Sequence, residues 1–149
     1  MQPFPHRYLV TAVAGTESEI ILQSDGLTAI RSALPAEFGG AGDRWSPETL
    51  LVAAVADCFT LTFRGVARAS RLEWTSLTCE VAGTLDRVDG VSRFTHFELR
   101  VQLQLPEGSS EALAHRVMAK AEQTCLVTRS MTATTELIAA VETVTAQLV

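Results

Sequence analysis

One long apolar segment constrains the fold of this chain more than any other feature. Ser46-Pro47-Glu48 supplies an N-cap serine, a proline at the first helical position and an early acid, so we expect a helix that begins there and runs toward Arg68. The helix is apolar on most of its circumference, which predicts burial through the middle of a domain. Its most apolar stretch, residues 50–63, is shorter than the roughly 20 residues of a membrane span, so we expect a core helix.

The segments on either side of this helix predict an α+β fold. Residues 7–13 and 19–23 are short and β-rich, which predicts an N-terminal β-hairpin ahead of a glycine-containing loop. Residues 77–81 and 97–105 alternate between apolar and polar side chains, as half-buried strands do. The Asp-Gly pair at 89–90 is typical of a hairpin turn between them. We therefore expect an antiparallel sheet after the central helix.

A second helix follows this predicted sheet. Ser109 or Ser110 caps it, and its apolar side chains recur at helical spacing on one face. That face consists of Ala114, Val117, Met118, Ala121 and Cys125. Cys125 is thereby placed at the inward C-terminal end of the helix. Residues 132–149 suit a helix by the spacing of their apolar residues, whereas their threonine and valine content favours a strand.

Length, charge and the two ends of the chain exclude several classes of function. The 149 residues fit a single domain spanning positions 1–149. The net charge of −5 argues against nucleic acid as a partner and disfavours anionic membranes. Residues 1–7 carry no basic segment followed by an apolar core, so we see no secretory signal and expect a cytoplasmic protein.

Metal and cofactor chemistry finds no support in the residue pattern. His6, His96 and His115 are scattered and make no paired ligand spacing, so we expect no metal site. The loop at 39–44 precedes a helix but lacks the G-x-x-x-x-G-K-[ST] pattern of a phosphate-binding loop. We expect no cofactor, and a cysteine hydrolase stays open because its base can lie far away in sequence.

The three cysteines are the remaining candidates for chemistry. Cys58 lies in the apolar central helix, where a cysteine often serves as a small hydrophobic residue. Cys125 offers a second inward-facing thiol on another helix. If the Cα atoms of the two come within about 7 Å, they can form a reversible disulfide, the resolving half of a peroxide-reduction cycle. Cys79 lies on the inward phase of a strand, and we expect it to contribute packing alone.

Two segments resemble the OsmC/Ohr family, named for osmotically inducible protein C and the organic hydroperoxide resistance proteins. Residues 38–51 read FGGAGDRWSPETLL and residues 54–59 read AVADCF, similar to the family's glycine loop, N/S-P-E, apolar helix and A-x-C-F. The ten-residue step from Glu48 to Cys58 also matches. Residues 120–130, KAEQTCLVTRS, are similar to the family's second cysteine motif. With the order of elements, the resemblance covers nearly the whole chain.

The resemblance implies a fold and an activity. The fold is an intertwined homodimer with a six-stranded sheet per protomer around the long central helices, and the tail becomes a strand. The activity is reduction of organic hydroperoxides, with Cys58 as the peroxidatic and Cys125 as the resolving cysteine. An arginine and Glu48 organise the thiolate. The implied reductant is a dithiol such as a lipoylated protein.

The arginine is where this sequence departs most from the family. In the hydroperoxide-resistance branch it lies in the N-terminal hairpin turn, but residues 14–19 contain none. Arg44, four residues before Glu48, is our substitute, because a nearby cation lowers the pKa of a thiol. Arg31 and Arg129 remain alternatives.

Two further departures concern the cysteines themselves. Asp57 replaces the small residue expected beside Cys58, and a nearby carboxylate opposes thiolate formation unless it points away. Leu126 replaces the usual proline after Cys125, which loosens the positioning of that cysteine.

The preferred interpretation is a thiol-dependent peroxidase in peroxide-stress defence. The alternatives are a non-catalytic small-molecule binding or stress-response protein of the same fold, and a thiol-dependent enzyme of another class.

Glu48 and Cys58 lie ten residues apart, which corresponds to about 15 Å along a straight helix. We therefore expect Glu48 to act on Cys58 of the other protomer, against the simpler alternative that it favours the positive end of its own helix.

Overall fold

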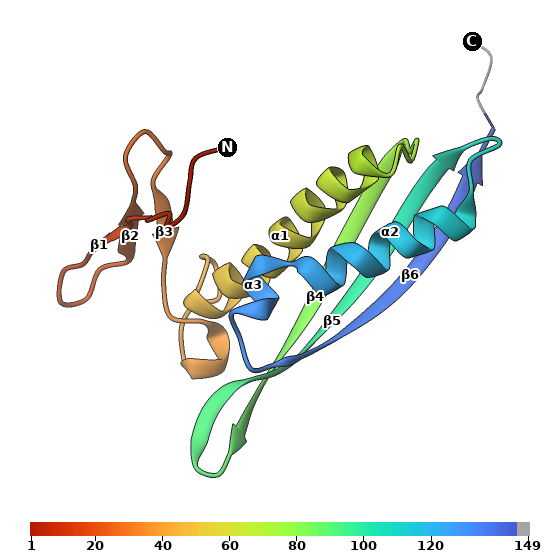
Figure 1. The fold of residues 1–149 in the computed structure, drawn as a ribbon. Helices are drawn as coiled ribbons and strands as arrows, with labels where there is room; N and C mark the ends of the chain where they lie inside the picture. Colours follow the sequence, from red (N-terminus) through yellow and green to blue (C-terminus); the bar gives the residue numbers. More distant parts are fainter. Residues whose placement is uncertain (146–149) are drawn as a thin grey trace. The chain divides into compact units, whose positions relative to one another are not determined.

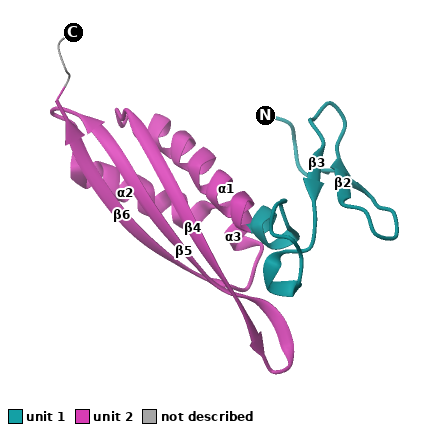
Figure 2. Cartoon of the chain, turned by 180° about the vertical axis from the view of Figure 1, so that it is seen from behind, with its two compact units in different colours: residues 1–51 teal, residues 52–149 magenta. Residues whose placement is uncertain are grey.

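The chain forms two compact units, residues Met1–Leu51 and Val52–Val149 (Figure 2). A computed structural model describes residues 1–145. Each unit contains one three-stranded sheet, and the helices complete a mixed α and β structure, which confirms the predicted α+β class. The six-stranded sheet implied by the family resemblance is not formed within the described part of a single chain. The organisation of residues 1–149 as one domain stays a prediction.

The first unit begins with the predicted N-terminal hairpin. Strands β1 (Thr11–Val13) and β2 (Ile20–Gln23) pair antiparallel, with Ala12 opposite Leu22. The hairpin is shorter than predicted, because residues 7–10 precede β1 and are not part of its ladder. A third strand that the sequence pattern did not reveal, β3 (Ile30–Ser32), pairs antiparallel with β2.

The segment between β3 and the central helix is anchored to β3. A short 3-10 helix, η1 (Ala36–Phe38), ends at Gly39, whose φ of 89° lies in the left-handed region that favours glycine. The backbone N–H of Ala33 donates to the carbonyl of Trp45 at 2.8 Å, and Trp45 also forms a bridge with Ser32. The residues just before the central helix are therefore held beside the first sheet.

The second unit is built on two long strands joined by the predicted turn. Strands β4 (Ser76–Val88) and β5 (Val91–Pro106) pair antiparallel along the whole of β4, with one bulge. Asp89 and Gly90 between them have φ values of 52° and 77°. Positive φ at both residues is typical of the two-residue type I′ turn, whose twist matches that of the flanking strands.

The tail forms strand β6 (Thr134–Val144), as the family resemblance implied. It pairs with β5 in the parallel direction, so the sheet is mixed and the predicted antiparallel arrangement holds for β4 and β5 alone. The reason is the connection: a helix carries the chain back across the sheet, and such a crossover produces parallel neighbours. Residues 146–149 of the predicted tail lie outside the described residues.

The helices of the second unit lie on one face of this sheet (Figure 1). They are residues 52–69 of α1 (Pro47–Ala69), α2 (Glu111–Thr124) and the single turn α3 (Leu126–Arg129). Gly83 of β4 allows the close approach of α1. A Cβ at this position would lie 2.8 Å from Val52 and 3.0 Å from Phe97, so a larger residue would push the helix and the sheet apart.

Helix α1 starts at the predicted residue. Ser46 caps it by accepting a hydrogen bond from the backbone N–H of Thr49 at 3.1 Å, and the Ser46 N–H donates to the Thr49 hydroxyl at 2.8 Å. Its fully buried residues repeat every four positions and make one stripe: Val55, Phe59, Phe63 and Ala67.

The predicted burial of α1 through the middle of a domain is limited to one stripe of the helix in a single chain. Outside the buried stripe its apolar residues are half-buried or exposed, and Leu61 is 55% exposed. The helix has 23 residues, longer than the apolar stretch read from sequence, and within residues 1–145 it is the one helix whose length and hydropathy would allow a membrane span. The core helix of a soluble protein passes the same test.

Helix α2 buries the face that its sequence predicts. Ser110 is its N-cap and accepts a hydrogen bond from the backbone N–H of Leu113 at 3.1 Å, which settles the choice between Ser109 and Ser110. The buried residues of this face are Ala114, Val117, Met118 and Ala121. Cys125 follows directly at the end of the helix with 1% exposure.

Candidate active site

Cys58 and Cys125 lie together where the middle of α1 meets the junction of α2 and α3. Cys58 is half-buried and precedes Phe59 of the buried stripe by one residue, which turns its side chain toward the edge of that stripe. Cys125 is buried. Both are free thiols, and each is among the groups that shift the pKa of the other. Two cysteines 67 positions apart in sequence (125 − 58) are thus brought into one site.

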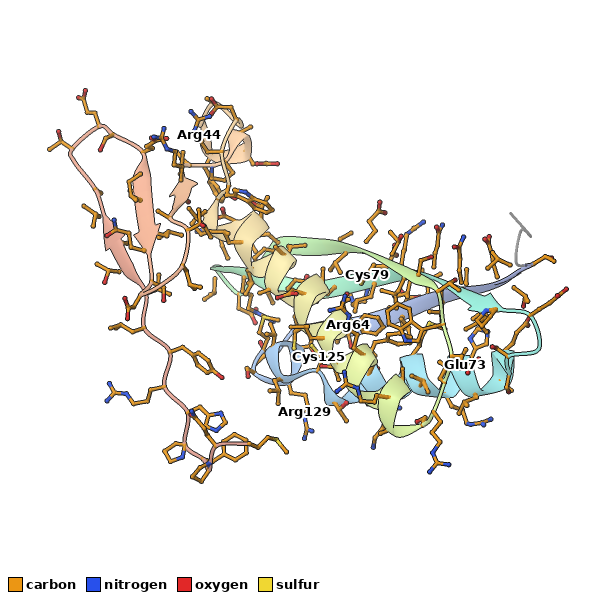
Figure 3. The ribbon with its side chains drawn as sticks, turned by 90° about the horizontal axis from the view of Figure 1, so that it is seen from above. Arg44, Arg64, Glu73, Cys79, Cys125 and Arg129 are labelled. Atoms are coloured by element: carbon orange, nitrogen blue, oxygen red, sulfur yellow. The ribbon has the colours of Figure 1, made fainter. Side chains whose placement is uncertain are left out.

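The chain changes direction at Cys125, and this break organises the site (Figure 3). Cys125 ends α2 and caps α3, with an extended ψ of 117° that neither helix would tolerate in its interior. Its carbonyl accepts hydrogen bonds from the backbone N–H of Arg129 at 3.1 Å and from the Thr128 hydroxyl at 3.2 Å. The first N–H groups of α3 have no carbonyl partner within the helix, so they are available to donate hydrogen bonds to the sulfur atoms.

These groups lower the pKa of the Cys58 thiol below its ordinary value. Burial has the largest effect and raises the pKa, but it is more than offset by hydrogen bonds to the sulfur. The donors are the backbone N–H of Val127, the thiol of Cys125, the hydroxyl of Thr62 and the backbone N–H of Leu126. Each donor favours the charged form of the acceptor, so together they stabilise a Cys58 thiolate.

The pKa of the Cys125 thiol is shifted in the opposite direction, above its ordinary value. Burial raises the pKa of its thiol, and the backbone N–H and hydroxyl of Thr128 only partly oppose that effect. The hydrogen bond and the charge of Cys58 raise it further, because a thiolate at Cys58 holds the proton on Cys125. The pair therefore consists of one thiol with a lowered pKa and one with a raised pKa.

Cys79 is chemically distinct from this pair. It is half-buried on β4 and stands opposite the buried Val101 of β5, on the inward phase that the sequence predicted. Burial, followed by the charge of Cys125, raises the pKa of Cys79 to about 11. A thiol with this pKa is protonated at neutral pH, which agrees with the predicted packing role.

Asp57 does not disturb the Cys58 thiolate. Its side chain is exposed, and it is not among the groups that shift the pKa of Cys58. Adjacent residues on a helix point about 100° apart, so the carboxylate is directed away from the sulfur.

The three candidate arginines lie in different surroundings. Arg44 donates from Nε to Glu19 at 3.1 Å, and its Nη1 lies 3.1 Å from the Asp43 carboxylate. Arg31 pairs with the same Glu19 at 2.9 Å. Arg129 ends α3 and is exposed. Of the three, Arg129 belongs to the same unit as Cys58, and it is not among the main groups that shift the pKa of that thiol.

Glu48 lies in the first turn of α1 and is half-buried. Its Oε2 is buried and has no hydrogen-bond partner in the part of the chain that the structure describes. A carboxylate oxygen out of contact with water is costly unless a donor or a cation satisfies it. The structure places Glu48 and Arg44 in the first unit and both site cysteines in the second, and the catalytic roles of the two charged residues remain predictions.

The described residues were also compared with the ligand sets that metal ions require. Within residues 1–145, no group of three His, Cys, Asp or Glu side chains is arranged to hold a metal ion.

The family model of the OsmC-like proteins matches residues 40–139 of this chain. The chain belongs to the OsmC/Ohr family. The uncharacterised protein YmaD of Bacillus subtilis is 27% identical over 135 residues, which cover 89% of this chain and 90% of YmaD.

Solved structures of OsmC-like proteins share the fold. An OsmC-like protein of unknown function from Vibrio cholerae superposes with a TM-score of 0.79 at 20% identity, over 90% of this chain and all of the other. The organic hydroperoxide resistance protein OsmC of Legionella pneumophila gives a TM-score of 0.73 at 22% identity, over 94% and 99% of the two chains. At these identities the likeness establishes the fold of this OsmC-like chain.

Sequence motifs did not reveal the hydrogen-bond donors to the two sulfurs in this OsmC-like protein. The donors from Leu126 and Val127 are backbone groups, and they depend on the break at Cys125, which no residue pattern indicates. Thr62 was within reach of sequence reasoning. It follows Cys58 by four residues, the spacing that places two side chains on the same face of a helix.

The unequal thiols predict an order of alkylation. Iodoacetamide reacts with thiolates, so as the pH is raised Cys58 should be labelled first, at a pH where Cys125 and Cys79 are still protonated. Peptide mass spectrometry after brief labelling at each pH measures the three sites separately. Labelling of Cys125 or Cys79 ahead of Cys58 would contradict the assignment.

Proposed function

We propose that this OsmC-like protein is a thiol-dependent peroxidase that reduces organic hydroperoxides in the cytoplasm as a defence against peroxide stress. The observation that carries the proposal is the unequal cysteine pair, a Cys58 with a lowered thiol pKa beside a Cys125 with a raised one. This is the division that a peroxidatic and a resolving cysteine require. Three structural neighbours are named organic hydroperoxide resistance proteins, which supports the same activity.

The reaction begins at Cys58. Its thiolate attacks the outer oxygen of the hydroperoxide, so that a sulfur–oxygen bond forms and the oxygen–oxygen bond breaks. The alkoxide leaves and takes up a proton to become the alcohol. Cys58 is now a sulfenic acid, and the peroxide has gained two electrons.

Cys125 resolves this intermediate. Its sulfur attacks the sulfur of the Cys58 sulfenic acid, and the departing hydroxide combines with the Cys125 proton to form water. The product is a Cys58–Cys125 disulfide. A dithiol such as a lipoylated protein then restores both thiols by two exchange reactions and becomes a disulfide itself.

The apolar surroundings of the pair favour organic substrates. Leu126, next to Cys125, is 73% exposed, and Leu61, three residues after Cys58, is 55% exposed in the single chain. An organic hydroperoxide that covers such side chains gains about 25 cal/mol for each Å² of apolar surface removed from water. Hydrogen peroxide has no apolar surface to bury.

The active form proposed here is a homodimer with shared sites. Much of α1 outside its buried stripe is apolar and uncovered in the single chain, which provides a surface for the partner helix. In an antiparallel pair of central helices, Glu48 of one protomer approaches Cys58 of the other. The buried and unpartnered Oε2 of Glu48 supports this arrangement, because a group from the partner would satisfy it.

Arg44 is the proposed cation of the shared site. Its ion pair with Glu19 holds it beside the end of the hairpin turn, the region where the family's hydroperoxide-resistance branch carries its arginine. Arg44 also precedes Glu48 by four residues. It would therefore enter the partner's site together with that carboxylate.

A second candidate function is supported by the missing arginine. The hairpin turn at residues 14–19, where the family's hydroperoxide-resistance branch carries its arginine, contains none. An OsmC-like protein that has lost its activating cation would serve as a non-catalytic small-molecule binding or stress-response protein. Such a protein would bind apolar ligands but would not consume peroxide.

The peroxidase predicts one specific product. One equivalent of cumene hydroperoxide should convert the reduced protein to a Cys58–Cys125 disulfide and leave Cys79 reduced, because Cys79 remains protonated at neutral pH. Non-reducing peptide mapping identifies the bridge. Cys79 in the bridge would refute the pairing, and full recovery of three free thiols would favour the binding protein.

The shared site predicts complementation between two inactive variants. Glu48→Ala and Cys58→Ser homodimers should both lose peroxidase activity, whereas a purified heterodimer of the two chains should recover about half of the wild-type rate, since one of its two sites has both groups intact. Glu37→Ala, which removes an exposed acid of η1, is the control and should remain active as a homodimer. Folded but inactive heterodimers would place Glu48 and Cys58 of the same chain in one site.

A further inference from the structure

Three cations lie on the surface of α2 and α3, close in sequence to Cys125. Arg116 and Lys120 are exposed and one helical turn apart on α2, on the side opposite its buried residues. Arg129 ends α3 and is exposed, and its side chain projects away from the ribbon (Figure 3). Within the described residues, none of the three forms an ion pair. We call these three residues the basic strip.

The acidic residues of the same helices do not neutralise the basic strip. Helix α2 contains two of them, Glu111 and Glu122, and α3 contains none. Glu122 accepts a hydrogen bond from the hydroxyl of Thr135, and Glu111 accepts one from the hydroxyl of Thr143 at 3.3 Å. Both hydroxyls are on β6, so both carboxylates are directed toward the sheet. The cations are therefore the charged groups that remain on the outer surface of the two helices.

The backbone ties the basic strip to Cys125. The N–H of Arg129 donates to the carbonyl of Cys125 at 3.1 Å. On the other side of the break, the carbonyl of Lys120 accepts a hydrogen bond at 2.7 Å from the hydroxyl of Thr124, the residue before Cys125. Leu126 is 73% exposed and adds an apolar side chain to the same surface. An apolar contact bordered by charged residues is typical of a surface that binds another protein.

The burial of the cysteine pair limits what can reduce it. In the proposed reaction a dithiol must reopen the Cys58–Cys125 disulfide, yet Cys125 is 1% exposed and Cys58 is half-buried. Cysteines fixed in the surface of another folded protein do not reach such a bond, whereas a dithiol at the end of a flexible arm does. The protein that carries the arm then contacts the surface beside the cysteines, and that surface is basic.

We propose that Arg116, Lys120 and Arg129 form a docking surface for an acidic protein that carries the reducing dithiol on a flexible arm. The inference rests on the proposed peroxidase function and deepens it by assigning the charge of the reducing partner. Opposite charges speed the encounter of two proteins and orient them. The chain as a whole has a net charge of −5, so an acidic partner is attracted at this surface and repelled elsewhere. A free, neutral dithiol gains nothing from the basic strip.

The exchange reaction itself requires only the dithiol. One of its thiolates attacks a sulfur of the Cys58–Cys125 disulfide, and a mixed disulfide forms as the other cysteine leaves as a thiolate. The second thiol of the arm then displaces the remaining cysteine. Two electrons pass to the cysteine pair, which also takes up the two protons that the dithiol loses, and the arm becomes a disulfide.

The test separates docking from chemistry by presenting the same dithiol in two forms. The protein is first oxidised with diamide, which takes two electrons from the cysteine pair, so that the preparation does not depend on peroxide. It is then reduced either by free dihydrolipoamide or by an acidic lipoyl domain that carries the dihydrolipoyl group. Samples are quenched by alkylation over time, and the recovery of the Cys58 thiol is measured by peptide mass spectrometry.

Two variants are compared with the wild type. The helix variant, Arg116→Glu with Lys120→Glu, reverses two charges of the basic strip, and Arg129 is left unchanged because its backbone is bonded to Cys125. The hairpin variant, Arg87→Glu with Arg93→Glu, is the matched control, because it reverses two exposed charges on β4 and β5 instead.

At low salt, the lipoyl domain should reduce the helix variant about tenfold more slowly than the wild type and the hairpin variant. The difference should shrink as NaCl is raised to about 0.5 M, because salt screens exposed charges. Dihydrolipoamide should reduce all three proteins at the same rate at every salt concentration. Arg116→Gln with Lys120→Gln, which should give a smaller loss in the same direction, replaces the helix variant if that protein does not fold.

Other outcomes separate the docking surface from the function on which it rests. Equal rates for all three proteins with the lipoyl domain, or an equal loss in the helix variant with dihydrolipoamide, would overturn the docking surface. A changed oligomeric state of the helix variant would also overturn it, since the surface would then belong to a contact between copies of this chain. Failure of diamide to join Cys58 to Cys125 refutes both proposals. A salt-dependent loss in a protein that diamide oxidises but peroxide does not upholds the docking surface and refutes the peroxidase.

Discussion

The pairing of Cys58 with Cys125 is the interaction on which the proposed chemistry of this protein depends. It joins the middle of α1 to the break between α2 and α3, and it makes the two thiols unequal. Burial raises the pKa of the Cys125 thiol, whereas hydrogen bonds to the Cys58 sulfur outweigh burial there and lower its pKa. An unpaired cysteine in the same core, Cys79, shows the alternative, because burial there raises the pKa of its thiol to about 11.

Packing on the sheet is what brings the two sulfurs together. The buried stripe of α1 and the inner face of α2 lie on the same face of the sheet formed by β4, β5 and β6 (Figure 1). Cys58 lies at the edge of the buried stripe of α1, and Cys125 lies at the end of the buried face of α2. Both side chains are therefore close to the junction of α2 and α3. The hydrophobic core therefore positions the polar site, at a place where backbone N–H groups are available.

The sequence predicted the elements whose signals are local. Ser46 and Pro47 marked the start of α1, the Asp-Gly pair marked the turn between the long strands, and the apolar spacing of α2 led to Cys125. Features set by tertiary structure were not predictable in this way. The three residues of β3 are too few to show a pattern, and alternation is the same in a parallel and an antiparallel strand, so the direction of β6 could not be read.

The candidate site was predictable only in part, for a related reason. Two apolar helices with inward cysteines suggested that Cys58 and Cys125 could meet, and the family motifs named both. The backbone donors depend on one extended residue at Cys125, and an irregular conformation at a single residue has no sequence signature. The proposed contributions of Glu48 and Arg44 require a second chain, and one sequence does not specify how its two copies associate.

A single turnover, stopped by rapid quenching, tests the central claim most directly. Reduced protein is mixed with a small excess of cumene hydroperoxide or of hydrogen peroxide, without any reductant, and the cumyl alcohol and the remaining peroxide are measured over time. The account predicts one equivalent of cumyl alcohol per chain, formed faster than hydrogen peroxide is consumed, and none from the Cys58→Ser variant. No alcohol from the wild type, or the same yield from Cys58→Ser, would contradict it.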